Sequence, residues 1–288
     1  QLDHQSEYSG LLAHDADADH HVPHATDRFA VGAQHHHPRE SGRIDPVDLE
    51  RAIRPAGNIH TPSPTMVCLE NTHNKCGGGV LTPEDTAKMA SVAHAAGASV
   101  HLDGARIFNA AVALEVPVRE LVKDVDDVSF CLSKGLSCPV GSVLCGSQEF
   151  IDQARKWRKM LGGGMRQAGV LAAAGLVALD GMIDRLAEDH DNARSFAQRI
   201  GSIEGVTILN PEVETNLVFF DVAGTGQSSK DVTARLRERG VWIGANGPTR
   251  MRAVTHLGVG KPAVDEAGEG AQATAEEPGE AAQATVEE

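Results

Sequence analysis

The sequence predicts an α/β fold with a mainly parallel sheet covered by helices. Short apolar runs alternate with helix-like segments from residue 42 to about residue 185, a rhythm typical of parallel α/β proteins. Hydrophobic residues make up 41% of the 288 residues, which is enough for a sizeable core. Aromatic residues make up only 3%, so we expect aliphatic side chains to fill that core.

The elements of the first part of the chain can be placed in order. Strands are predicted at the apolar runs, residues 66–70, 99–102, 128–133 and 142–145. The clearest helix covers residues 82–96, because Thr82 is a typical N-cap, Pro83 suits the first turn and Gly97 ends it.

The later part of the chain reads as a smaller α/β domain. A long helix is predicted after Leu186, and a second helix near residues 229–239. Further strands are predicted at residues 215–221, 241–243 and 251–256.

Four zones follow from this order. Residues 1–41 hold eight of the fourteen histidines without clear periodicity, so we expect a disordered or foreign segment; no ligand spacing supports a metal-binding tract. Residues 42–185 form an incomplete large domain, and residues 186–262 a small C-terminal domain. Residues 263–288, rich in Ala, Glu and Gly, are expected to be a disordered acidic tail.

Charge and cysteine content restrict the possible partners. The net charge of −14 argues against binding to nucleic acid or to an anionic membrane surface, since both attract Lys and Arg. No apolar run is long enough to span a membrane. The five cysteines are odd in number and lack CxxC spacing, which favours buried free thiols in a reducing cytoplasm over disulfides or zinc.

An apolar strand runs directly into Asp103, with Gly104 and Arg106 just behind it. Ligands of open α/β sheets bind at the carboxyl ends of strands, so Asp103 stands where a ligand would bind. Its carboxylate could hold a protonated pyridine nitrogen, and the forked donors of Arg106 could bind a carboxylate. The alternative is a helix-capping aspartate and a surface arginine.

A second apolar strand ends in Ser133, Lys134 and Gly135. A lysine at the end of a buried strand is poorly solvated, which favours the uncharged amine as a nucleophile towards an aldehyde. Gly135 lets the backbone turn tightly beside a ligand. The alternative is a surface lysine whose stem covers apolar neighbours.

Together these segments resemble the low-specificity L-threonine aldolases. The resemblance covers roughly residues 42–258 and rests on six segments, namely Leu69–Asn74, His101–Arg106, Cys131–Leu136, Pro139–Ser142, Trp157–Gln167 and Arg252–Leu257. It implies a pyridoxal phosphate (PLP) enzyme of fold type I, usually a homotetramer with active sites built between subunits.

The resemblance also implies roles for individual residues near the cofactor. Lys134 matches the lysine that forms the Schiff base with PLP, and Asp103 matches the partner of the pyridine nitrogen. Lys159 and Arg166 match a basic pair near the cofactor and the subunit interface. The glycine run 162–164 is either a flexible turn or a loop that lets Arg166 approach a phosphate.

Three further matches concern the substrate. Arg106 and Arg252 match the groups that bind its carboxylate, and His60 matches a histidine near its hydroxyl, although His60 could equally be a loop residue without a role. The implied reaction is cleavage of L-threonine or L-allo-threonine to glycine and acetaldehyde. The alternatives are a related PLP lyase or aldolase acting on other β-hydroxy amino acids, or an inactive truncated remnant.

Both ends of the chain depart from the family pattern. The Gly-Thr pair that binds the cofactor phosphate and the histidine that stacks on its ring are not found, and matching begins near Gly42. The last helix of the family is replaced by the Ala/Glu tail. A truncated or frame-disrupted reading frame would account for both departures, and weak PLP binding is then expected.

Overall fold

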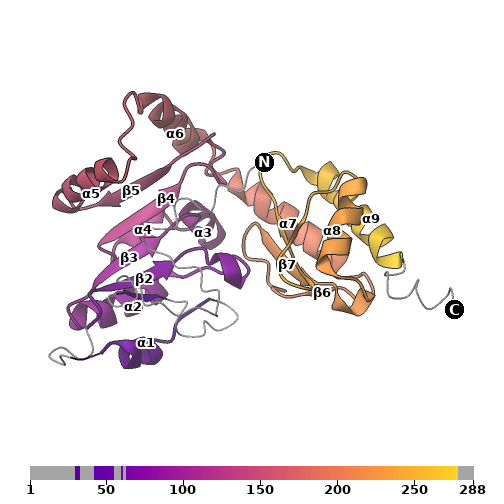
Figure 1. Cartoon of the computed structure of the whole chain (residues 1–288), viewed down its shortest axis with the longest axis horizontal. Helices are drawn as coiled ribbons and strands as arrows, with labels where there is room; N and C mark the ends of the chain where they lie inside the picture. The colour runs from indigo at the N-terminus through magenta and orange to yellow at the C-terminus, as the bar shows by residue number, and fades with distance from the viewer. Residues whose placement is uncertain (1–29, 33–41, 55–59, 61–62, 278–288) are drawn as a thin grey trace.

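The computed structural model describes residues 30–32, 42–54, 60 and 63–277. These residues form two α/β lobes that lie side by side, each built on its own sheet (Figure 1). We call the lobe that ends with helix α6 the large domain, and the lobe that begins with helix α7 the small domain.

The large domain contains a five-stranded sheet in the order β1-β2-β3-β4-β5. Its strands are β1 (Ala30–Gly32), β2 (Met66–Glu70), β3 (Ser99–Asp103), β4 (Asp127–Cys131) and β5 (Ser142–Gly146). Strands β1 to β4 are parallel, and β5 is antiparallel to β4. The predicted α/β class with a mainly parallel sheet is therefore confirmed.

Six α-helices of the described chain belong to this domain, namely α1 (Pro46–Ala52), α2 (Pro83–Ala95), α3 (Ile107–Leu114), α4 (Val118–Val122), α5 (Gln148–Met160) and α6 (Gly169–Gly181). The signals at the start of α2 act as predicted. The Thr82 hydroxyl accepts from the Asp85 N–H at 3.1 Å, while the Asp85 carboxylate accepts from the Thr82 N–H at 3.0 Å. This capping box satisfies two backbone donors at the helix start.

The two faces of the large sheet differ in chemistry, because successive side chains of a strand point to opposite faces. On one face Val67, Leu69, Val100 and Leu102 pack in a hydrophobic core with residues of α1 to α4. The other face carries polar and ionisable side chains of β2, β3 and β4, namely Cys68, Glu70, His101, Asp103, Asp127 and Ser129. Functional chemistry is therefore concentrated on one face.

The small domain contains a four-stranded antiparallel sheet in the order β6-β7-β9-β8. Its elements are α7 (Leu186–Ile200), β6 (Thr207–Ile208), β7 (Leu217–Asp221), the short 3-10 helix η5 (Ala223–Thr225), α8 (Ser229–Glu238), β8 (Gly244–Ala245), β9 (Arg250–Val254) and α9 (Lys261–Glu276). The strand predicted near residues 241–243 lies slightly later in the chain, where β8 begins at Gly244. Val241 and Ile243 are buried in the hydrophobic core of this domain but are not paired in its sheet. Their apolar pattern therefore reflects burial and not strand pairing.

The predicted disordered tail needs correction, because residues 261–276 form helix α9, which packs against α7 and α8. Val264 lies in the core of the small domain, and Ala267, Ala271 and Ala275 pack against it at helical spacing. Composition alone concealed this pattern, since alanine forms helices well but contributes little hydrophobicity. Residues 278–288, and residues 1–41 apart from β1, lie outside the described part of the chain.

The five cysteines are free thiols, but the expectation that they are buried holds only for Cys138. Cys68, Cys76 and Cys131 are half-buried, and Cys145 is exposed on β5. Burial raises the pKa of the Cys68 thiol to about 11, which keeps it protonated and unreactive near neutral pH.

Candidate active site

The carboxyl ends of β2, β3 and β4 lie next to each other at one edge of the large sheet. Glu70 at the end of β2 is in register with Asp103 at the end of β3, which is in register with Ser129 on β4. Backbone bonds tie these ends together, since the Asn71 N–H donates to the Asp103 carbonyl at 2.9 Å and the Gly104 N–H donates to the Ser129 carbonyl at 2.8 Å.

Asp103 is exposed at this edge, and its carboxylate accepts from the Ala105 N–H at 2.9 Å. This bond stabilises the turn before α3. The helix itself begins at Ile107 and has Arg106 as its N-cap residue, so Asp103 is not the helix cap that the alternative interpretation required. Only a glycine suits position 104, because a Cβ there would lie 2.9 Å from the Ser129 carbonyl oxygen.

Lys134 lies half-buried in the loop between β4 and β5, where its carbonyl accepts from the Ser137 N–H at 2.8 Å. The next residue, Gly135, packs tightly. A Cβ at that position would lie 2.7 Å from Leu186 Cδ2 and 3.2 Å from Asn109 Oδ1. The loop that carries Lys134 is therefore held against both α3 and α7.

A buried polar pair joins the same two helices. Asn109 on α3 donates through Nδ2 to Nε2 of His190 on α7 at 3.1 Å. Because Nε2 accepts, His190 is neutral in this arrangement. Burial, with a smaller effect of the Arg194 charge, lowers the pKa of His190 to about 4. Sequence reasoning missed this pair, since nothing local connects residues that are 81 positions apart.

The two arginines predicted to bind a carboxylate lie close together although they come from different domains. Asn74, at the start of the 3-10 helix η4 (Asn74–Cys76), accepts through Oδ1 from Arg106 Nη2 at 3.4 Å and from Arg252 Nη1 at 3.0 Å. Arg106 is only 8% exposed. Burial lowers its pKa, and the charge of Arg252 adds to this, while the nearby carboxylate of Glu70 has the opposite effect.

The segment after β2 contributes polar residues to which sequence reasoning gave no role. Glu70 accepts from the Asn74 N–H at 2.9 Å, and its other oxygen lies 3.5 Å from Nε2 of the buried His73. The available signal was their position, since they follow a strand in the segment Leu69–Asn74 that resembles the family.

Three predicted site residues are not brought into this cluster in the described chain. Lys159 on α5 and Arg166 in the loop after it are exposed. A Cβ at position 164 would overlap the Lys159 side chain, so the glycine run lets this loop fold back over the helix. His60 lies in an exposed turn between two segments outside the described residues.

The residues of the cluster fit PLP at two positions. Asp103 presents a carboxylate, the group that a protonated ring nitrogen needs, and Lys134, after the neighbouring strand, presents an amine for the aldehyde.

Two features are absent from the described residues, 30–277 without the gaps stated above. No group of three His, Cys, Asp or Glu side chains is arranged to hold a metal ion. None of the helices there is both long and apolar enough to cross a membrane.

Sequence comparison places the chain in a family. The profile of the family described as beta-eliminating lyase matches residues 5–224. This profile match begins before Gly42, where the resemblance to the low-specificity L-threonine aldolases is expected to start.

Individual relatives agree with this assignment. The chain is 45% identical over 219 residues to low-specificity L-threonine aldolase 1 of Arabidopsis thaliana, covering 75% of this chain and 61% of that protein. It is 39% identical over 209 residues to the low specificity L-threonine aldolase of Escherichia coli K12, covering 73% and 60%. The chain thus spans about three fifths of the length of these relatives.

Solved structures show the same fold at low sequence identity. The threonine aldolase of Leishmania major matches with a TM-score of 0.66 and 17% identity, over 82% of this chain and 68% of that one. A PLP-dependent aminotransferase from Streptococcus suis matches with a TM-score of 0.63 and 19% identity, over 81% and 61%. The predicted fold type I is confirmed, and the chain belongs to the beta-eliminating lyase family of PLP enzymes, with low-specificity L-threonine aldolases among its relatives.

Proposed function

We propose that this protein cleaves L-threonine and L-allo-threonine to glycine and acetaldehyde with PLP as cofactor. The observation that carries this proposal is the convergence of Arg106 and Arg252 on one oxygen of Asn74, beside the strand end that bears Asp103. Two guanidinium groups from different domains form a site for a carboxylate, the group that every amino-acid substrate carries. The relatives named low-specificity L-threonine aldolases supply the reaction.

Bound PLP supplies an electron sink that stabilises negative charge at the substrate Cα. The chain's own residues then have separate tasks. The Asp103 carboxylate holds a proton on the ring nitrogen, because a neighbouring negative charge favours the protonated form. The Lys134 amine would hold the cofactor through its aldehyde group, and the loop that carries Lys134 is packed at Gly135 against α3 and α7.

Substrate orientation falls to the arginine pair. Arg106 and Arg252 fix the carboxylate, which orients the bonds at Cα relative to the ring. Cleavage between Cα and Cβ also needs a base that removes the hydroxyl proton, and we assign this role to His60 by its match to the family.

We further propose a cytoplasmic homotetramer in which Lys159 and Arg166 bind the cofactor phosphate across a subunit interface. Their exposure in the single chain supports this assignment, as do exposed apolar residues around them such as Met160 and Met165. The five free cysteines are consistent with a reducing compartment.

The test is to replace Lys134 and compare it with an exposed lysine of α2. Lys134→Ala should abolish acetaldehyde release from L-threonine, whereas Lys88→Ala should leave it unchanged. Borohydride reduction of the PLP-loaded protein, followed by peptide mapping, should label Lys134. A label on another lysine would overturn the assignment of Lys134. Faster turnover of aryl β-hydroxy amino acids than of threonine would show that threonine is not the preferred substrate.

A further inference from the structure

Arg106 and Arg252 are held close together although their charges repel. Burial lowers the pKa of Arg106, the Glu70 carboxylate acts in the opposite direction, and the charge of Arg252 lowers the pKa further. Like charges in a partly buried site separate unless acceptors hold them. Something in the protein must therefore keep the pair in place before a substrate carboxylate arrives.

Asn74 provides the shared acceptor. Its Oδ1 accepts from Arg106 Nη2 at 3.4 Å and from Arg252 Nη1 at 3.0 Å. The amide is neutral, so it can hold both guanidinium groups without neutralising the charge that a carboxylate needs. The backbone of Asn74 is fixed in turn, because its N–H donates to Glu70 at the end of β2.

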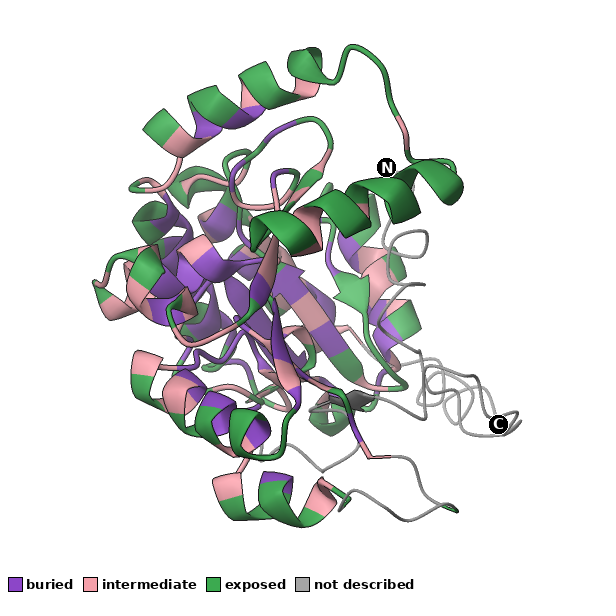
Figure 2. Ribbon diagram, turned by 90° about the vertical axis from the view of Figure 1, so that its left-hand side faces the viewer, coloured by how far each residue is buried: buried purple, intermediate pink, exposed green. Residues whose placement is uncertain are grey.

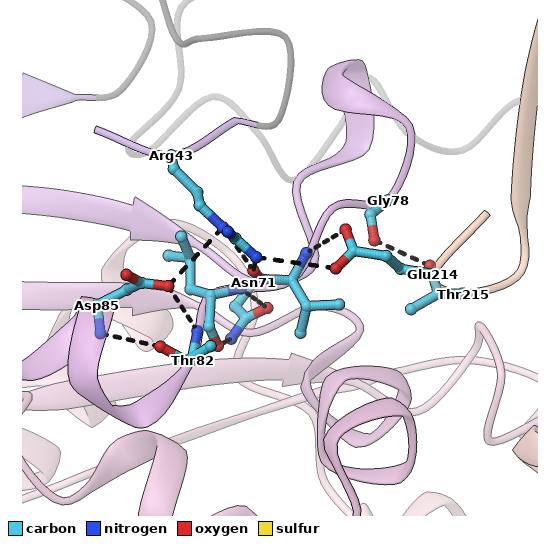
Figure 3. Close-up of polar contacts among 9 residues, drawn as sticks. Arg43, Asn71, Gly78, Thr82, Asp85, Glu214 and Thr215 are labelled. Atoms are coloured by element: carbon cyan, nitrogen blue, oxygen red, sulfur yellow. Dashed lines mark hydrogen bonds and ion pairs between the residues drawn. The ribbon is translucent and has the colours of Figure 1, made fainter. Parts of the chain in front are cut away.

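The segment 78–81, which follows Asn74 in the chain, is bonded both to Asn71 and to the small domain (Figure 3). Asn71 exchanges two hydrogen bonds with Leu81, through Nδ2 at 2.9 Å and Oδ1 at 3.2 Å. On the other side, the Val80 N–H donates to Glu214 at 3.3 Å, and the Thr215 hydroxyl donates to the Gly78 carbonyl at 2.9 Å. The segment 78–81 thus connects the loop of Asn74 with residues of the small domain.

We propose that Asn74 is a positioning residue that sets the spacing of Arg106 and Arg252 for the substrate carboxylate. This inference rests on the proposed function, in which the two arginines bind that carboxylate. It goes further by making carboxylate recognition depend on a neutral acceptor at position 74. An aspartate there would pair with both arginines and compete with the substrate, although it would hold them in place.

Two variants separate this role from a merely structural one. Asn74→Ala removes the acceptor, and Asn74→Asp keeps it but adds a negative charge. The matched control is Asn192→Ala, which removes another amide donor, the one that bonds to the Val259 carbonyl in the small domain at 3.0 Å. All are loaded with PLP and titrated calorimetrically with glycine and with ethanolamine, which has the same amine but no carboxylate.

The wild-type chain should bind glycine more tightly than ethanolamine. Asn74→Ala should weaken glycine binding by about tenfold, the order expected for one charge-assisted hydrogen bond, and leave ethanolamine binding unchanged. Asn74→Asp should weaken glycine binding further, while its thermal unfolding midpoint equals or exceeds that of the wild type. Asn192→Ala should keep the wild-type preference.

Two other outcomes have separate meanings. If both Asn74 variants keep the wild-type preference for glycine, or if Asn74→Asp binds glycine as the wild type does, Asn74 does not position the arginines. If the wild type itself binds glycine and ethanolamine equally, the arginine pair does not recognise a carboxylate. That result would refute the proposed function and this inference with it.

Discussion

Two regions of the large domain use apolar residues in opposite ways. In strands β2 and β3, Val67, Val100 and Leu102 are fully buried beneath helices of the same domain. In the arm formed by β5, α5 and α6, by contrast, α5 has no buried residue, and Met160 and Val177 are 73% and 71% exposed. Figure 2, which faces this side of the molecule, shows both helices of the arm coloured mostly as exposed.

The difference shows that an apolar sequence pattern predicts which residues are buried. It does not predict whether the same chain or another subunit buries them. Monomers seldom leave large apolar patches open, and extended patches mark interaction surfaces. The core of β2 and β3 is completed by helices nearby in the same chain. The arm has no such cover among the described residues, which supports the proposed assembly of subunits.

The largest expected effect on stability lies in the packed region. Leu102→Ala should lower the free energy of unfolding by about 2–5 kcal/mol, because it removes buried methyl groups and leaves a cavity. The matched change in the arm, Leu176→Ala, should alter it by only about 0.5 kcal/mol, since Leu176 is 66% exposed. Urea denaturation measures both, and equal losses would show that the arm is packed as tightly as the core.

The second prediction concerns pH and the buried His190. Its pKa is lowered in the folded state to about 4, whereas the unfolded chain has a value of about 6.5. The unfolded state therefore binds protons first as the pH falls, so stability present above pH 6.5 is lost between about pH 6.5 and pH 4. Each unit is worth about 1.4 kcal/mol, which makes the full loss a few kcal/mol.

Urea denaturation at pH 7 and pH 5 measures this loss in the wild type and in His190→Gln. Glutamine can still accept from Asn109 but does not titrate, so its stability should depend less on pH. An unchanged pH dependence in the variant would assign the effect to other groups.

The third prediction compares two glycines. Gly135→Ala should destabilise the protein by about 1–3 kcal/mol, because the added Cβ would lie 2.7 Å from Leu186 Cδ2 in the packed loop. Gly181→Ala, at the end of α6, meets no atom within 4 Å and should be neutral or slightly stabilising. Thermal unfolding of both variants measures the contrast, and a neutral Gly135→Ala would mean that the Lys134 loop can move away from α7.

The smallest effect on the stability of the single chain should come from a charge in the arm. Met160→Glu should change the free energy of unfolding by about 0.5 kcal/mol or less. It should nevertheless prevent assembly, since a charge inside an apolar interface is costly to bury. Analytical ultracentrifugation compares its mass with that of Lys156→Ala, and an unchanged oligomer would place the interface elsewhere.

Local signals in the sequence were sufficient for several elements. Strand β2 has the predicted bounds, and α2 differs from its prediction by one residue at each end. The sequence signals for both come from adjacent residues, such as the apolar run of β2 and the Thr82 capping box. Helix α9 was missed because its stability comes from contacts with α7 and α8, which lie far away in the chain.

The sequence by itself therefore determined the fold class, the strand end that carries Asp103, and the family, whereas β4 ends at Cys131 and leaves Lys134 in the loop that follows. Only the tertiary structure decided that Arg106 and Arg252 share Asn74 and that His190 is held neutral against Asn109. The physical reason is the separation along the sequence between the residues that interact. Capping, alternation and strand-end chemistry are properties of adjacent residues, whereas the charge state and spacing of these side chains depend on groups that meet only when two domains pack together.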